Sequence, residues 1–182
     1  PVQRIQLVIN QHFSRPAGVD VTPAGIFVAD GYGNRRVVHY SLDGKFIKTW
    51  GTFGDVGGVL GDPLLLYGPR GIVVDSQNNV LVSDTGNKRV VKYTSDGVFV
   101  QQWGGSGSVE GQFREPCGVA MDANDGVYVA DVWNQRVQEF DRAGSYVAQW
   151  PVVGWESEAP VNKPYLAIGS QGSVYVTQPD YH

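Results

Sequence analysis

The sequence holds few of the residues from which proteins build cross-links and metal sites. It has one cysteine and three histidines among 182 residues, and no apolar run approaches the roughly 18 residues of a membrane-spanning helix. The lone cysteine, Cys117, cannot form a disulfide within the chain. Positive charge is scarce too, since 14 Lys and Arg face 18 Asp and Glu, for a net charge of −4. This balance argues against a nucleic acid partner, because phosphate binding needs a basic face.

Sequence motifs of common enzyme classes are also missing. There is no Ser-His-Asp order, no phosphate-binding glycine loop with Lys-Ser/Thr, and no paired-cysteine metal motif. Cys117 has no basic partner in view, which favours a structural thiol over a nucleophile. The sequence therefore predicts no catalytic residues, no metal ligands and no cofactor.

A repeat with a period of about 50 residues accounts for most of the chain. Its copies begin at Pro16, Pro69, Pro116 and Pro164, and the first three carry, in order, an apolar run ending in Asp, an Asn-x-Arg element and a Trp. Each full copy has four short apolar runs separated by turn residues, and nothing predicts a helix longer than one turn. Four antiparallel strands per repeat are typical of a β-propeller blade.

We therefore predict an all-β fold, a single partial β-propeller over residues 1–182 with three full blades and part of a fourth. The blades are expected at about 16–51, 69–104 and 116–151, with an incomplete one at 164–182.

The ordered elements Pro-x-Gly-Ile/Val, Val-Phe/Tyr-Val-Ala-Asp, Asn-x-Arg-Val and Trp-Gly resemble the NHL-repeat family, over residues 16–177. Propellers of this family commonly close with more blades than this chain supplies, so the resemblance implies an open arc. We expect further blades, a second copy or another subunit to cover its ends. The family's bacterial members outside the cytoplasm often sit beside membrane anchors, so the resemblance favours an extracytoplasmic location.

Three residue types recur once in each full copy. A Trp at the end of the fourth strand is expected to pack between blades. An Arg two residues after an Asn is expected to bind loop carbonyls or the Asp of the same copy, although a ring of such Arg residues would also suit an anion. These residues are Trp50, Trp103 and Trp150, Arg36, Arg89 and Arg136, and Asp30, Asp84 and Asp131.

The variable loops favour one rim of the propeller as the binding surface. In such blades the loops between the second and third strands share a rim with the connections between blades, which here vary in length and composition. We interpret the chain as a non-catalytic module that presents this rim to a protein, peptide or glycan. The candidate rim residues are Tyr32, Arg35, Arg70, Trp133 and Trp155, and Tyr32 and Trp133 are expected to be exposed.

An enzyme is the first alternative. The segment Asp30–Val37 resembles a motif of the peptidyl-hydroxyglycine α-amidating lyases, propellers that use a Tyr, an Arg and a zinc held by three His. The resemblance implies the Tyr role for Tyr32. However, those lyases carry Pro-His where their blades start, and here the corresponding pairs have no His. A metal-dependent lactonase-like propeller is a related option, with the rest of its site in further blades.

RNA binding is the second alternative, because some NHL propellers bind RNA through a basic rim. The overall acidic charge weighs against it. A local cluster between the first two blades would be needed, formed by Arg35, Arg36, Arg70, Lys88 and Arg89.

Overall fold

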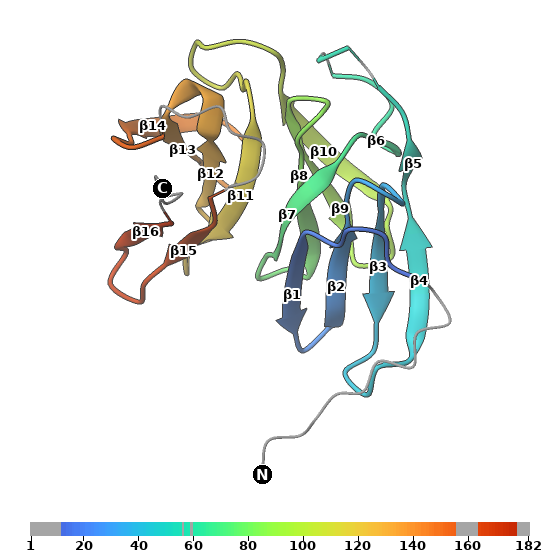
Figure 1. Cartoon of the computed structure of the whole chain (residues 1–182). Helices are drawn as coiled ribbons and strands as arrows, with labels where there is room; N and C mark the ends of the chain where they lie inside the picture. The colour runs from blue at the N-terminus through green and yellow to red at the C-terminus, as the bar shows by residue number, and fades with distance from the viewer. Residues whose placement is uncertain (1–11, 56, 59, 156–163, 178–182) are drawn as a thin grey trace.

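The computed structural model describes residues 12–55, 57–58, 60–155 and 164–177. Its strands form three four-stranded antiparallel sheets and a final two-stranded hairpin (Figure 1). The prediction of an all-β propeller with four-stranded blades is thus confirmed. The first blade contains β1 (Gly18–Thr22), β2 (Gly25–Asp30), β3 (Arg36–Tyr40) and β4 (Phe46–Trp50). The second contains β7 (Pro69–Val74), β8 (Asn79–Asp84), β9 (Arg89–Thr94) and β10 (Phe99–Gly104). The third contains β11 (Pro116–Met121), β12 (Val127–Asp131), β13 (Arg136–Phe140) and β14 (Tyr146–Pro151).

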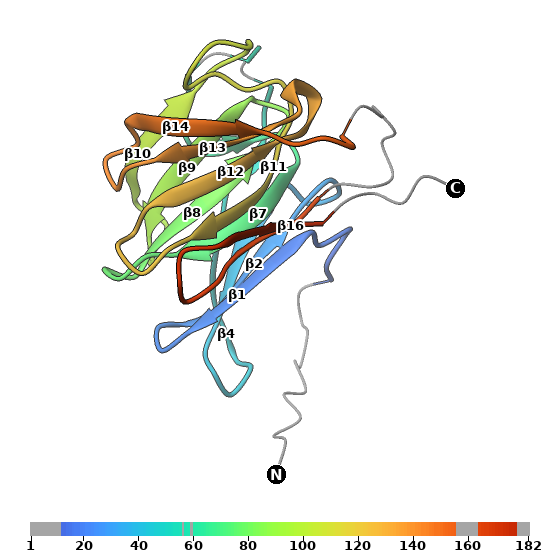
Figure 2. The ribbon, with the colours of Figure 1, turned by 90° about the vertical axis from the view of Figure 1, so that its left-hand side faces the viewer.

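The first strand of each blade lies at the centre of the arc. Strands β1 and β11 both contact β7, and β15 (Leu166–Ile168) of the final hairpin contacts β11. The hairpin is completed by β16 (Val174–Val176), and in the side view of Figure 2 it lies along the inner edge of the arc. In the described part of the chain, no helix is long and apolar enough to cross a membrane.

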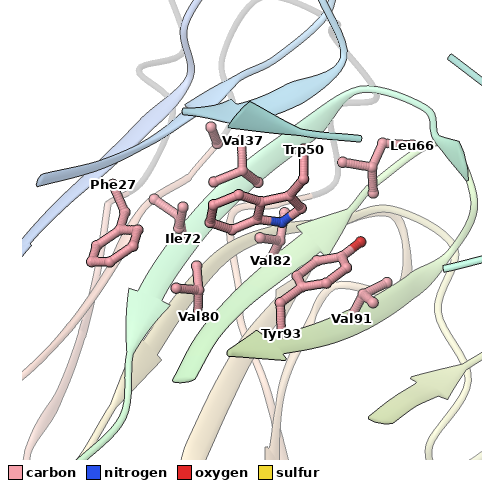
Figure 3. Close-up of a cluster of buried hydrophobic side chains, with 10 residues drawn as sticks. Phe27, Val37, Trp50, Leu66, Ile72, Val80, Val82, Val91 and Tyr93 are labelled. Carbon is pink, nitrogen blue, oxygen red and sulfur yellow. The ribbon is translucent and has the colours of Figure 1, made fainter. Parts of the chain in front are cut away.

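Each blade meets the next through a layer of apolar side chains. Between the first two blades, Trp50 of β4 inserts among Ile72, Val82 and Tyr93 of the second blade (Figure 3). Alternation along the strands places these residues on facing sides of two sheets. A second layer surrounds Trp103 in the same way at the next junction. The apolar core of this molecule therefore lies between blades.

The recurring Asp, Asn and Arg form one polar latch in each blade. In the second blade, Asp84 accepts hydrogen bonds from Asn87 Nδ2 at 2.7 Å and Arg89 Nε at 2.9 Å. Its other oxygen accepts the backbone N–H of Tyr67 from the incoming connection. The first and third blades repeat the Asp–Asn and Asp–Arg contacts. The structural interpretation of the recurring Arg is therefore confirmed, and a free ring of Arg is excluded.

Two kinds of connection lie at opposite ends of the strands. We call the loop rim the residues between the second and third strands of each blade, together with the connections between blades. The turn rim consists of the short turns within each blade. Within the described residues, the loop rim comprises 31–35, 51–55, 57–58, 60–68, 85–88, 105–115 and 132–135. The turn rim comprises 23–24, 41–45, 75–78, 95–98, 122–126 and 141–145.

Candidate binding rim

The long connection 51–68 is held in place by the latch of the second blade. Asn87 Nδ2 donates to the carbonyls of Gly54 and Leu65, both at 3.0 Å. The Arg89 guanidinium, with no exposed surface, donates to further carbonyls of the same loop. A short parallel pair, β5 (Thr52–Phe53) and β6 (Leu65–Leu66), closes the loop on itself. The backbone of this connection is therefore anchored to the second blade at Gly54, Gly61, Asp62 and Leu65.

An arginine in contact with two aromatic rings lies on the loop rim. Arg35 places its Cζ atom 4.0 Å from the ring centre of Phe53 and 5.9 Å from that of Tyr67. Phe53 is 51% exposed and packs edge-on against Tyr67. The sequence predicted Arg35, but it gave no signal for Phe53, because no other connection carries an equivalent residue.

Tyr32 and Arg70 form a second pair. Arg70 donates from Nε and Nη2 to the Tyr32 hydroxyl, at 2.9 and 2.8 Å, and its guanidinium lies over the Tyr32 ring. The sequence named both residues without placing them together. Tyr32 is half-buried, so the expectation of an exposed ring is wrong. The ring lies against Gly68, where any Cβ would approach Tyr32 Cε1 to 2.8 Å.

Trp133 and Lys88 form a third cation–aromatic contact. The Lys88 ammonium lies 5.4 Å from the centre of the Trp133 ring and 3.4 Å from Glu115 Oε2. Trp133 lies in a short 3-10 helix, η1 (Val132–Asn134), and is half-buried, contrary to the expected exposure. Lys88 and Arg35 hold the same position in the repeat, and both have a positive φ, 57° and 54°.

Trp155 does not lie on the surface. Its side chain is 2% exposed and packs with Tyr128, Val137 and the final hairpin. Its indole N–H donates to the Thr177 carbonyl at 3.4 Å. The expectation of a rim aromatic is therefore wrong for Trp155, because the fourth copy folds over the connection that carries it.

The residues that follow the first Pro of each copy meet at the mouth of the central channel. Ala17, Arg70, Cys117 and Tyr165 line one small pocket there, and the Tyr165 hydroxyl donates to the Ala17 carbonyl at 3.2 Å. These residues do not fit the zinc site of the amidating lyases, because they include a guanidinium and no His. His39 lies away from the mouth, stacked on Phe27. Among the described residues, no cluster of three His, Cys, Asp or Glu is placed to hold a metal.

The channel itself is apolar. A cavity of about 880 Å³ runs along the inner strands and is lined by Ile72, Val119 and Met121, among others. Asp20 is the one charged residue among the described lining residues. Both its oxygens accept backbone N–H groups, from Val21 and Val74. Among the described lining residues, the channel therefore offers a ligand no free charged side chain, and the candidate charged residues Arg35 and Arg70 lie on the loop rim and at the channel mouth.

The basic cluster required for RNA binding is mostly neutralised. Arg36 and Arg89 pair with Asp30 and Asp84 inside the latches, and Lys88 pairs with Glu115. Of the five residues named for this cluster, Arg35 and Arg70 alone form no ion pair within the described part of the chain.

Comparison with known proteins agrees with the repeat and the fold. The NHL repeat model matches residues 66–93 and 113–140. Peptidyl-glycine alpha-amidating monooxygenase of Mus musculus is 35% identical over 88 residues, which are 47% of this chain and 9% of that protein. The chain thus spans a small part of this relative.

Two solved structures superpose on nearly the whole chain. A streptogramin B lyase gives a TM-score of 0.64 at 15% identity, covering 94% of this chain and 51% of that one. A nidogen/laminin complex gives 0.63 at 18% identity, covering 94% and 58%. At these identities the likeness establishes the fold alone. The chain carries NHL repeats and folds as the blades of a β-propeller.

Proposed function

We propose that this chain is a non-catalytic binding module that presents its loop rim to a protein or peptide. The single observation that carries the proposal is the clustering of cation–aromatic pairs. All four such contacts of the described residues lie on the loop rim or at the channel mouth beside it. Aromatic side chains and arginine are the residues most enriched at the centres of protein interfaces.

The rigidity of this surface supports the same role. The latch of the second blade fixes the connection that carries Phe53 and Tyr67. A surface already fixed in the unbound state loses less conformational entropy on binding. The loop rim therefore suits specific recognition by a preformed site.

A selection from random short displayed peptides tests the proposal. Peptides enriched on the wild-type chain should lose binding to Phe53→Ala and retain it to Leu42→Ala, which removes an exposed residue of the turn rim. Failure to enrich any peptide, or enrichment that Phe53→Ala leaves intact, would refute rim recognition of polypeptides. Circular dichroism of both variants controls for folding.

A lyase is the second candidate function. The identity with the mouse relative and the Tyr32–Arg70 pair favour it, whereas the residues at the channel mouth do not fit zinc. Turnover of a peptidyl-α-hydroxyglycine substrate, with loss of activity in Tyr32→Phe, would establish this candidate. No turnover by the purified chain, with or without added zinc, would leave the binding module as the function.

A further inference from the structure

We propose that the partner segment is acidic, and that one of its carboxylates binds the Arg35 guanidinium where it stacks on Phe53. This inference rests on the proposed function and specifies the chemistry of the ligand at the same rim. Three observations carry it: the distribution of unpaired charge, the geometry of Arg35, and the small number of free cations.

Positive charge without a partner gathers on the loop rim. Within the described part of the chain, seven Lys and Arg side chains form ion pairs. Of the others, Lys48 lies on β4, and the rest lie on the loop rim or beside it at the start of a blade. These four are Arg15, Arg35, Arg70 and Arg114.

The turn rim has the opposite character. Its turns carry six aspartates. Among the residues that the structure describes, Asp96, Asp122 and Asp141 form no ion pair, whereas Asp43, Asp75 and Asp125 pair with Lys45, Lys92 and Arg142.

The loop rim also carries carboxylates, at Asp55, Asp62, Glu110 and Glu115, so its attraction for an acidic segment is local to the cations without an ion pair. At Arg35 a carboxylate meets such a cation, and complementary charges favour association. The acids on the connection 51–68 compete little for Arg35, because Asp55 and Asp62 accept backbone N–H groups of their own loop.

The half-buried Arg35 lies against Phe53 and forms no ion pair with any described residue. Its backbone is left-handed, at φ 54°, and its Cζ atom lies 4.0 Å from the ring centre of Phe53. Its Nε atom is buried and has no hydrogen-bond partner among the described residues. A guanidinium stacked on an aromatic ring still presents the edge that binds a carboxylate through two parallel hydrogen bonds.

The small number of free cations favours an acidic peptide over RNA. Binding of a nucleic acid backbone draws on many phosphate contacts, each of which needs a cation. The latches and the Lys88–Glu115 pair remove three of the five cations that would have formed such a patch. The cations that remain match a segment with one or a few carboxylates.

The test is a double-mutant cycle on the most tightly bound peptide from the display selection. Each Asp or Glu of the peptide is replaced by its amide, and Arg35→Gln is the protein variant. Gln135 holds the equivalent position in the third blade with the same φ of 54°, so this substitution suits the local backbone. Lys45→Gln on the turn rim is the matched control.

We expect one acid-to-amide change to weaken binding at least about tenfold, the effect of losing a charge-assisted hydrogen bond. In Arg35→Gln the same change should have little further effect, and Lys45→Gln should bind like wild type. Peptides that need Phe53 but show no loss with any amide change would overturn the acidic partner and leave rim binding standing. If no peptide is enriched, both the binding-module proposal and the acidic-partner proposal are refuted. If an oligouridylate binds more tightly than the acidic peptide, RNA recognition replaces this inference.

Discussion

Trp50 and Trp150 occupy the same place in the repeat and have opposite environments. Trp50 is 7% exposed and lies 5.9 Å from the ring of Tyr93 in the next blade. Trp150 is 43% exposed and stacks at 6.3 Å on Tyr128 of its own blade. Trp103, at the second junction, is buried like Trp50 and contacts Phe140. The difference shows that the following blade, and not its own, buries each Trp.

The largest expected loss of stability comes from replacing Trp50, the buried member of the Trp50 and Trp150 comparison. Trp50→Ala removes an indole from a packed layer, so it should lower the free energy of unfolding by about 3–5 kcal/mol. Trp150→Ala removes a half-exposed ring and should cost below about 1 kcal/mol. Urea unfolding followed by circular dichroism measures both. Equal losses would show that Trp150 is covered in solution, for example by a second copy.

Substitution of Gly97, which lies against the Trp50 ring, should give the next largest loss of stability. Gly97 has φ +76°, and a Cβ there would lie 2.6 Å from the Trp50 ring. Gly172 has nearly the same φ, +77°, with nothing within 4 Å of its Cβ position. Left-handed backbone alone costs about 1–2 kcal/mol for alanine. Gly97→Ala should therefore destabilise the chain clearly more than Gly172→Ala, and thermal melting that ranks them equally would contradict the packing shown at this junction.

A polar contact between the second and third blades should make stability depend on pH. Asp125 accepts hydrogen bonds from the backbone and side chain of Ser76 and pairs with Arg142. Burial acts to raise the pKa of Asp125, but the bonds from Ser76 and Arg142 outweigh it and lower the pKa below its usual value. The ionised carboxylate is therefore favoured by folding. Its contribution is present above the unfolded pKa and is lost as pH falls through the lower folded pKa.

Asp125→Asn should therefore reduce stability at neutral pH by about 1 kcal/mol or less, because Arg142 is half-exposed. The gap between variant and wild type should close as pH falls below about 4. Denaturant unfolding at several pH values measures this. If the stability difference between Asp125→Asn and wild type widened on acidification, the pKa of Asp125 would be raised on folding and not lowered.

The smallest expected effect is a late ionisation of the Tyr128 hydroxyl, next to the exposed Trp150. Burial, with Glu139 and Asp122 nearby, raises the pKa of Tyr128 to about 12. Absorbance of tyrosinate on alkaline titration should show this residue ionising after the exposed tyrosines. Burial raises the pKa of Tyr40 and of Tyr93 as well, so Tyr128→Phe should lower the late part of the curve by one hydroxyl and leave the rest. Loss of an early part instead would mean that the open end of the third blade admits water to the Tyr128 hydroxyl.

The sequence predicted what repeats and missed what is particular to one blade. The period and the ordered Pro, Asp, Asn, Arg and Trp elements were sufficient for the blades and for the pairing of Asp84 with Arg89. The contact of Tyr32 with Arg70 could not be read from the pattern, because it joins adjacent blades through a loop one residue longer than its counterparts. For the same reason Phe53 was missed and Trp155 was misjudged, since the exposure of Phe53 depends on a unique connection and that of Trp155 on the final hairpin.

Hydrogen–deuterium exchange of the chain, with and without the most tightly bound peptide of the selection, tests the central claim most directly. The account predicts slower exchange in residues 31–35 and 51–68, which carry Tyr32, Arg35 and Phe53. Exchange in the turns at 41–45 and 141–145 should not change. Protection confined to those turns, or to the inner strands β1, β7 and β11 that line the channel, would contradict the loop rim as the binding surface.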